Sequence, residues 1–251
     1  MYLGFRVPSH DLIDLIYKDI DDFDTYSLQH QLSYLRDRVI LCPHNVDVNT
    51  INESILAKFP GDEVSYLSAD STSQSDSTHN GTDSSIPVEY LNTLTLSGMP
   101  LHRTDVKIGC PLILLRGLDQ PNGLCNGTRL ILTAIKSRVL EAIILSGEHV
   151  GKRAFIPRIT STSASNLDLP FTLHRRQFPI RLGFAMTINK AQGQSVSIVG
   201  INLSTPAFAH GQLYVALSRA TDIKTLYVGL PDNSIGLTSN IVYKEALSED
   251  I

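Results

Sequence analysis

The stretch GFAMTINKAQGQSVSIVGINL, residues 183–203, decides the fold that we expect. Its second half, VSIVGINL (196–203), has the length and composition of a buried strand. The following run FAHGQLYVALSRA (208–220) predicts a helix, and LYVGL (226–230) predicts another strand. Strands that alternate with helices in this way are typical of an α/β domain with a parallel sheet.

An earlier part of the chain repeats this pattern. RVILCPHN (38–45) predicts a compact strand that ends in turn-forming residues. VDVNTINESILAKF (46–59) predicts a helix, because apolar residues from Val48 to Phe59 recur at helical spacing. HDLIDLIYKDI (10–20) predicts a short amphipathic helix that packs on the core. The working loops of such a sheet lie at the carboxyl ends of its strands.

Between these two parts lies a β-rich region. Short runs rich in strand formers are separated by Gly, Pro and Asn in GCPLILLRG (109–117), GTRLILTAI (127–135), RVLEAIILSG (138–147) and GKRAFIPRI (151–159). Their spacing predicts a small antiparallel barrel or sandwich that is inserted into the α/β domain. The polar run SADSTSQSDSTHNGTDSS (68–85) has no apolar periodicity and predicts a surface loop, either a linker or an insertion within one domain.

These patterns predict a chain organised in five parts. The parts are an N-terminal helical lead-in (1–37), the first part of the α/β domain with its loop at 68–85 (38–103), the β-rich insert (104–180), the second part of the α/β domain (181–232) and a C-terminal tail (233–251). A chain of 251 residues is long enough for one large domain or two smaller ones.

Composition indicates a globular protein with an uneven distribution of charge. The chain is 42% hydrophobic and 18% charged, which is ordinary for a packed domain and too apolar for wholesale disorder. The net charge is -4, yet no Asp or Glu occurs from Leu169 to Thr221. The cations of this acid-free stretch are Arg175, Arg176, Arg181, Lys190 and Arg219. The stretch fits either a surface that approaches phosphates or a buried segment that happens to lack acids.

Several classes of protein are not indicated. No run approaches the roughly 20 apolar residues of a membrane-spanning helix, and the N-terminus lacks a basic region followed by an apolar run. We therefore expect neither secretion nor a membrane partner. Cys42, Cys110 and Cys125 show no CxxC spacing and the histidines are scattered, so we expect no disulfide framework and no metal site. We expect an intracellular protein with reduced thiols, with a nuclear location as the first expectation and a mitochondrial location as the alternative.

The chain contains no nucleotide-binding P-loop. Such a loop needs GxxxxGK followed by Ser or Thr, so that backbone amides, the lysine and the hydroxyl hold the phosphates and magnesium. The nearest imitation, GEHVGKR (147–153), has a glycine spacing one residue too short and carries Arg153 in place of the hydroxyl. It also lies between two strand-like runs, so it predicts a hairpin turn. No acidic pair after an apolar strand resembles a magnesium-binding Walker B element.

Four segments carry a resemblance to a known family. GFAMTINKAQGQSV (183–196) and GQLYVALSRAT (211–221) resemble, in this order, motifs V and VI of superfamily 1 helicases. RVILCPHNVDVNTIN (38–52) resembles the motif IV region, and GCPLILLRGLDQPNGLCNGTRLIL (109–132) resembles the entry to their small 2B domain. The combination is similar to the Pif/RecD-like branch, named for the petite integration frequency helicases, and particularly to the versions found in Helitron transposons. The resemblance covers residues 38–230.

The resemblance implies a fold and an activity. The fold is a RecA-like α/β domain, called 2A, interrupted by a small β-barrel that resembles an SH3 domain, called 2B. The chain is then the C-terminal motor half of an ATP-dependent DNA helicase, which in this family typically moves 5′ to 3′ along single-stranded DNA. A further N-terminal RecA-like lobe would supply the P-loop and the Mg2+ site. We therefore expect ATP and Mg2+ only together with that lobe, and no ATP hydrolysis by this chain alone.

Candidate DNA-binding residues lie in the first motif and in the motif IV region. Thr187, Asn189, Lys190 and Gln192 bring short polar groups and one cation together, which suits contacts to a sugar-phosphate backbone. The resemblance adds Asn45 to this set. The sequence departs from the family at Asn189, where family members often have a histidine. The pair Arg175 and Arg176 offers a further contact to DNA.

Candidate nucleotide-binding residues are Gly193, Gln194 and Arg219. The resemblance places Gln194 where the segment turns from the DNA toward the nucleotide, and Gly193 permits close approach of the backbone. Arg219 matches the motif VI arginine that reaches the γ-phosphate, a task that suits a planar and permanently charged guanidinium. The resemblance therefore makes Arg219 the catalytic candidate. Alternatively, Arg219 closes a salt bridge with a neighbour such as Asp222.

Each motif, and the chain as a whole, also has a simpler interpretation. AMTINKAQG (185–193) alone also fits a helix end capped by Gly193, and LYVALSRAT (213–221) alone also fits a core helix. The chain as a whole also fits a stand-alone nucleic-acid-binding module without a motor, or an inactive fragment derived from a transposon.

Overall fold

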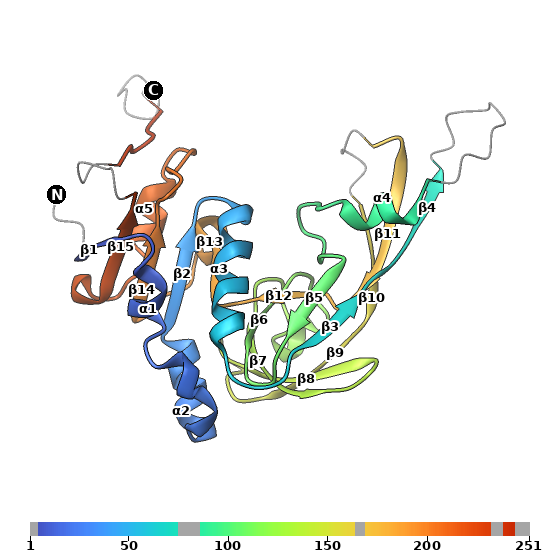
Figure 1. Ribbon diagram of the computed structural model, residues 1–251, viewed down its shortest axis with the longest axis horizontal. Helices are drawn as coiled ribbons and strands as arrows, with labels where there is room; N and C mark the ends of the chain where they lie inside the picture. Colours follow the sequence, from blue (N-terminus) through green and yellow to red (C-terminus); the bar gives the residue numbers. More distant parts are fainter. Residues whose placement is uncertain (1–4, 75–85, 164–168, 232–237, 244–251) are drawn as a thin grey trace. The chain divides into compact units, whose positions relative to one another are not determined.

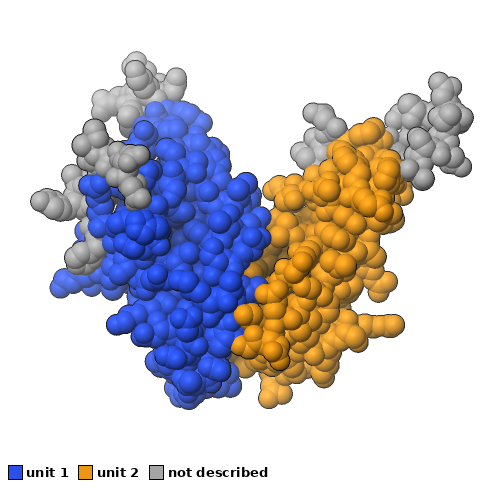
Figure 2. All heavy atoms as spheres, viewed as in Figure 1, with its two compact units in different colours: residues 1–60, 183–251 blue, residues 61–182 orange. Residues whose placement is uncertain are grey.

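A computed structural model describes residues 5–74, 86–163, 169–231 and 238–243. These residues form two compact units, which Figure 2 distinguishes by colour. Unit 1 comprises residues 1–60 and 183–251, and unit 2 comprises residues 61–182.

Unit 1 contains a five-stranded parallel sheet (Figure 1). In spatial order its strands are β1 (Phe5–Pro8), β15 (Leu226–Leu230), β14 (Ile198–Asn202), β2 (Arg38–Cys42) and β13 (Ala185–Thr187). Every neighbouring pair runs parallel. The central strands β2 and β14 are buried along nearly their whole length, as expected of parallel strands that are covered on both faces. The predicted strands at 38–45, 196–203 and 226–230 are therefore confirmed.

The helical segments of unit 1 are α1 (Leu12–Ile16), η1 (Ile20–Thr25), α2 (Leu28–Arg36), α3 (Asn45–Lys58), η3 (Ile188–Ala191), α5 (Gln212–Leu217) and η4 (Ile223–Thr225). The predicted helix at 46–59 is confirmed, because α3 buries its apolar residues from Val48 to Leu56. Close packing of α1 on β14 depends on Gly200, since a Cβ at that position would lie 2.8 Å from Cγ1 of Ile16.

Two expectations for unit 1 were only partly right. The N-terminal lead-in contains a strand, β1, as well as helices, because its backbone extends the sheet beside β15. The helix predicted at 208–220 is shorter and spans Gln212–Leu217. It begins after Gly211, whose φ of 70° is left-handed and breaks the helical path before it.

The main sheet of unit 2 is antiparallel and five-stranded, in the order β12 (Ile180–Leu182), β6 (Pro111–Leu114), β7 (Arg129–Ile135), β8 (Val139–Ile144) and β9 (Arg153–Pro157). This sheet confirms the β-rich insert. The segment GEHVGKR joins the antiparallel strands β8 and β9, with left-handed glycines at Gly147 and Gly151. It is therefore a hairpin connection, as predicted.

A second set of elements in unit 2 was not expected. A three-stranded sheet is formed by β10 (Ile159–Thr162), β11 (Phe171–Gln177) and β4 (Ala69–Gln74), and a two-stranded sheet by β3 (Val64–Leu67) and β5 (Arg103–Val106). The remaining helices are α4 (Val88–Thr93) and η2 (Gln120–Asn122). Apolar residues of α4, of β11 and of the segment after α4 form a small core of their own, centred on Leu91, Met99, Phe171 and Leu173. We call β4, β10, β11 and α4 together the arm.

The predicted loop at 68–85 is wrong for residues 69–74, which form β4 and pair with β11. Backbone pairing with β11 and the buried ion pair of Asp70 with Arg175, rather than apolar side chains, hold this strand, so its sequence shows no apolar periodicity. Residues 75–85 lie outside the described part. The strand pairs β3–β5 and β4–β11 also place residues 61–103 in unit 2, whereas we assigned 38–103 to the α/β domain. Within the described ranges, no helix has both the length and the hydropathy needed to cross a bilayer.

Candidate functional site

Two of the DNA-binding candidates meet at the carboxyl edge of the parallel sheet. Thr187 is the last residue of β13 and lies opposite Cys42, the last residue of β2. Asn45 begins α3, directly beyond β2, and its side chain is exposed. Because β2 and β13 are neighbours, Asn45 and Thr187 lie at the same edge, where ligands of parallel α/β sheets commonly bind.

The 3-10 helix η3 presents the other candidates from the same edge. Its Ile188 and Ala191 are buried, which anchors the turn on the core. Asn189 and Gln192 are exposed and Lys190 is partly exposed. The residues that we predict to contact one sugar-phosphate backbone therefore lie on or directly beside a single short turn.

A buried asparagine that the sequence analysis missed holds this edge in place. Asn52 of α3 is 4% exposed. Its Nδ2 donates to the carbonyl of Ala185 at 3.2 Å, and its Oδ1 accepts from the amide of Ala185 at 2.9 Å. These bonds clamp β13, and with it Thr187, to α3. The signal was a polar residue within the apolar face of a predicted helix, where buried polar groups need partners.

The nucleotide-binding candidates form a second group, which we call the corner, directly after η3: the amide of Gln194 donates to the carbonyl of Ala191 at 3.0 Å. The Nη1 of Arg219 donates to the carbonyl of Gln194 at 3.0 Å, and the amide of Val196 donates to the carbonyl of Arg219 at 3.0 Å. Gly193 has a φ of 81° and is exposed, and a Cβ there would meet no atom within 4 Å. The structure thus brings Gly193, Gln194 and Arg219 together.

Thr187 and Arg219 lie toward opposite ends of the sheet, but the two candidate groups adjoin, because Nε2 of Gln194 donates to the carbonyl of Lys190 at 3.4 Å. Thr187 lies beside Cys42 at the end of β2, whereas Ile198 lies beside Arg38 at its beginning. Residues 188–197 therefore run back along the whole strand, a length of roughly 16 Å for five residues. The Gln194–Arg219 contact lies near the amino end of β14, away from Thr187.

The guanidinium of Arg219 has only neutral acceptors. Besides Gln194, its Nε donates to the carbonyl of Val215 at 3.0 Å and its Nη2 to the Oγ of Ser218 at 2.8 Å. Within the described ranges no carboxylate forms an ion pair with it, and Asp222 instead accepts a bond from the amide of Lys224 at 2.9 Å. The alternative of a salt bridge between Arg219 and Asp222 is therefore wrong.

The cations of the acid-free stretch are buried at some positions and exposed at others. Arg175 is fully buried and its Nη2 lies 2.7 Å from Oδ2 of Asp70, so our expectation that it contacts DNA is wrong. Burial lowers the pKa of Arg181, whose Nη2 donates to the carbonyl of Met99 at 3.3 Å. Arg176 is exposed on β11.

The cysteines do not form part of either site. Cys42 and Cys110 are buried and Cys125 is exposed, and all are free thiols. Burial raises the pKa of Cys110 to about 12, and burial likewise raises the pKa of Cys42. Among the residues that the structure describes, no group of His, Cys, Asp and Glu side chains could hold a metal ion.

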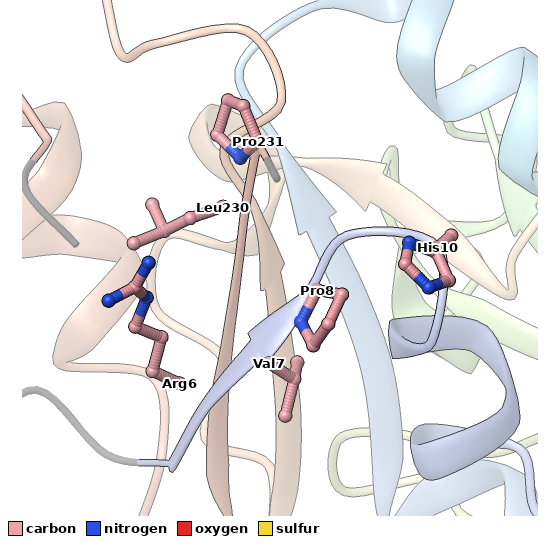
Figure 3. Close-up of a pocket in the computed structure, with 6 residues that line it drawn as sticks. All are labelled: Arg6, Val7, Pro8, His10, Leu230 and Pro231. Atoms are coloured by element: carbon pink, nitrogen blue, oxygen red, sulfur yellow. The ribbon is translucent and has the colours of Figure 1, made fainter. Parts of the chain in front are cut away.

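A hollow of about 450 Å³ lies elsewhere in unit 1 (Figure 3). Its lining includes Arg6, Pro8 and His10 from β1 and the turn after it, and Leu230 at the end of β15. It therefore opens at the far end of the carboxyl edge, and none of the predicted site residues lines it.

Comparison with known proteins gives a consistent set of relatives. A family model described as DNA helicase Pif1, 2B domain, matches residues 89–135, which lie within unit 2. The ATP-dependent DNA helicase PIF1 of Rattus norvegicus is 32% identical over 201 residues, 77% of this chain and 28% of the relative. The human PIF1 is 31% identical over the same share of each. The chain thus spans less than a third of the length of these relatives.

Solved structures show the same fold. A Pif1 helicase from Candida albicans superposes with a TM-score of 0.63 at 19% identity, covering 95% of this chain and 56% of that one. A Bacteroides Pif1 bound to single-stranded DNA superposes with a TM-score of 0.58 at 21% identity, covering 95% and 51%. The fold is therefore a RecA-like α/β domain with a 2B domain, as predicted.

Proposed function

Since the chain belongs to the Pif1-like superfamily 1 helicases and is a C-terminal portion of one, we propose that it forms half of an ATP-driven DNA motor. In this proposal the carboxyl edge of the parallel sheet binds single-stranded DNA, and Arg219 acts on ATP held by another RecA-like lobe. The observation that supports the proposal is that one sheet carries both candidate sets, with Thr187 at its carboxyl edge and Arg219 bonded beside the segment that enters β14. The two sets adjoin, because Nε2 of Gln194 donates to the carbonyl of Lys190 at 3.4 Å. A motor needs both, a surface for DNA and a surface for nucleotide, on one rigid body.

The binding surface for DNA consists of polar side chains that reach out from one edge. Asn45, Thr187, Asn189 and Gln192 offer hydrogen bonds, and Lys190 adds a positive charge. Groups of this kind contact phosphates and sugars, so they position a strand without reading its sequence. A relative from Bacteroides has been seen with single-stranded DNA, which supports the choice of ligand. A DNA substrate also favours a nuclear or mitochondrial location.

Arg219 is suited to a phosphate that comes from outside the chain. Its three donated bonds go to carbonyl and hydroxyl oxygens, so its charge is not neutralised by a carboxylate of the described residues. A guanidinium in this state can bind phosphate oxygens in pairs and stabilise the charge that develops during phosphoryl transfer. The sequence contains no P-loop, so ATP and Mg2+ would be held by the other lobe.

The DNA half of the proposal can be tested on this chain directly. Affinity for a fluorescein-labelled oligothymidylate is measured by anisotropy at several salt concentrations, for the wild type, Lys190→Ala and the control Lys224→Ala. Lys224 is an exposed lysine on η4 and belongs to neither candidate set. Each neutralised phosphate releases about 0.7 counterions, so binding should weaken steeply with salt and Lys190→Ala should lower the slope by about that amount.

The control should leave both the affinity and the slope unchanged. Affinity that does not depend on salt, or Lys190→Ala and Lys224→Ala variants that bind equally well, would rule out this edge as the DNA-binding surface. Binding that survives while Arg219→Ala has no effect in an assembled motor would favour a stand-alone nucleic-acid-binding module instead.

A further inference from the structure

Two aromatic rings from separate segments stack on each other at the carboxyl edge of the sheet. The ring centroids of His44 and Phe208 lie 4.6 Å apart, with an angle of 23° between the ring planes. His44 follows β2, and Phe208 lies between β14 and α5. Because β2 and β14 are neighbours in the sheet, the stack stands over the ends of its two most deeply buried strands.

The stack is exposed although one ring covers part of the other. Phe208 is 54% exposed, so a large part of its ring remains available to a ligand. A single exposed aromatic residue is ordinary on a protein surface. Here, however, the ring is held against a second ring, and His44 immediately precedes the candidate Asn45.

The surrounding chain fixes both rings. His44 is the N-cap residue of α3, yet its side chain makes no capping hydrogen bond, and its imidazole stacks on Phe208 instead. The amide of Phe208 donates to Oε1 of Gln212 at 3.0 Å, and Gln212 is 3% exposed. A buried side chain thus holds the backbone of Phe208 in place. The segments that carry the two rings are thus joined both by the stack and, for Phe208, by the bond to Gln212.

We propose that the His44–Phe208 stack is a platform on which a nucleobase of single-stranded DNA stacks. This inference rests on the proposed DNA binding at the same edge and names the part of DNA that the edge holds besides phosphate. Every base has a flat π-face, so such a platform adds affinity without choosing a sequence. Phe208 also lies in the acid-free stretch, so its sequence neighbours bring no carboxylate toward the strand.

The test compares Phe208→Ala with Phe208→Trp and with the control Tyr214→Ala. Tyr214 is an aromatic residue of α5 that is 73% exposed and outside the stack. Loss of one base stack weakens binding by about 5- to 100-fold, so Phe208→Ala should bind oligothymidylate that much more weakly. Phe208→Trp and Tyr214→Ala should bind like the wild type.

A second measurement reports stacking itself. An oligonucleotide with 2-aminopurine in place of one base should lose fluorescence when the wild type binds, and should keep it when Phe208→Ala binds at saturation. The wild type should bind an oligonucleotide with abasic sites more weakly than it binds the intact oligonucleotide. The wild type and Phe208→Ala should bind the abasic oligonucleotide equally well. The comparison of abasic with intact strands tests stacking even if Phe208→Ala is less stable, because it can be made with the wild type alone.

The outcomes separate this inference from the proposed function. If the wild type binds DNA in a way that depends on Lys190 but binds abasic and intact strands equally, the stacking platform is wrong and the DNA-binding edge stands. If the wild type binds no single-stranded DNA, both proposals fall.

Discussion

Arg175 and Arg219 come from the same acid-free stretch of sequence but lie in different units, and the structure uses them in opposite ways. Arg175, in the arm of unit 2, donates to both carboxylate oxygens of Asp70 and to the carbonyls of Leu91, Leu94 and Pro100. Arg219, in unit 1, donates only to neutral oxygens and is partly exposed. One cation is neutralised by a buried carboxylate, and the other has no carboxylate partner among the described residues.

The comparison shows that the role of a charged residue depends on partners that can be far away in the sequence. Asp70 lies 105 residues away from Arg175 along the chain, so no local pattern reveals the pair. A buried cation without a counter-charge would be strongly unfavourable, and the fold supplies one together with carbonyls from the α4 region. A partly exposed cation is solvated and needs no such partner. The two arginines should therefore respond differently to substitution.

The largest effect is expected from Arg219. In a protein that joins this chain to a RecA-like lobe with a P-loop, Arg219→Ala should lower ATP turnover by about 10³- to 10⁵-fold, because the charge on the transferred phosphoryl group loses its partner. DNA affinity should be nearly unchanged, since Arg219 bonds to Gln194, Val215 and Ser218 and to none of the DNA-binding candidates. Arg219→Lys should rescue poorly, because one ammonium cannot replace paired hydrogen bonds.

Turnover, DNA affinity and melting temperature should be measured on the same preparation, with Lys224→Ala as the control. If Arg219→Ala keeps near-normal turnover, or loses turnover only because it unfolds, Arg219 has no catalytic role. The proposed difference between Arg219 and Arg175 is then wrong.

The next largest effect is expected from Arg175. Arg175→Met should destabilise unit 2 by about 3–5 kcal/mol, because Asp70 stays buried without its counter-charge. Replacing both partners, as Asp70→Leu with Arg175→Met, should be less destabilising than Arg175→Met alone. Recovery should be partial, since three backbone carbonyls still lose their donor.

Urea unfolding measures these differences, and Arg176→Ala is the matched control because this neighbouring arginine is exposed on β11. A double variant that is no more stable than Arg175→Met, or an Arg176→Ala variant as unstable as Arg175→Met, would contradict the role given to the ion pair.

The smallest effect concerns the cysteines, which report on the two units separately. Cys42 is buried in unit 1 and Cys110 in unit 2, while Cys125 is exposed. Only thiolates react rapidly with disulfide reagents, and burial raises the pKa of Cys110 to about 12 and raises that of Cys42 as well. At about pH 8 the native chain should therefore react at Cys125 alone.

In Arg175→Met, partial denaturation should expose Cys110 before Cys42, because only unit 2 is weakened. Mass spectrometry of labelled peptides identifies the reacted thiols. Simultaneous labelling of Cys42 and Cys110 at every urea concentration would show that the two units unfold together.

Much of the fold could be predicted because it depends on residues that are close in sequence. The strands at 38–45 and 196–203 and the helix at 46–59 follow from runs of apolar residues, and their order gives an α/β domain. Polar strand β4 could not be predicted, because its stability comes from pairing with β11, whose residues lie far along the chain. For the same reason the predicted insert begins at residue 104, whereas unit 2 begins at residue 61.

The candidate site divides in the same way. The motifs named Thr187, Lys190 and Arg219, since short polar groups, a cation and a guanidinium are chemically suited to DNA and phosphate. The sequence could not show that Asn52 clamps β13 or that His44 stacks on Phe208, because each contact joins segments that only folding brings together.

The sequence by itself thus determined the family, the alternation of strands and helices, and the chemical character of the residues at each motif. Only the tertiary structure decided which cation is neutralised, where along the sheet Thr187 and Arg219 lie, and which rings meet. The physical reason is range. Periodicity and residue chemistry act between neighbours in the chain, whereas ion pairing, burial and stacking depend on distances in space that the folded backbone sets.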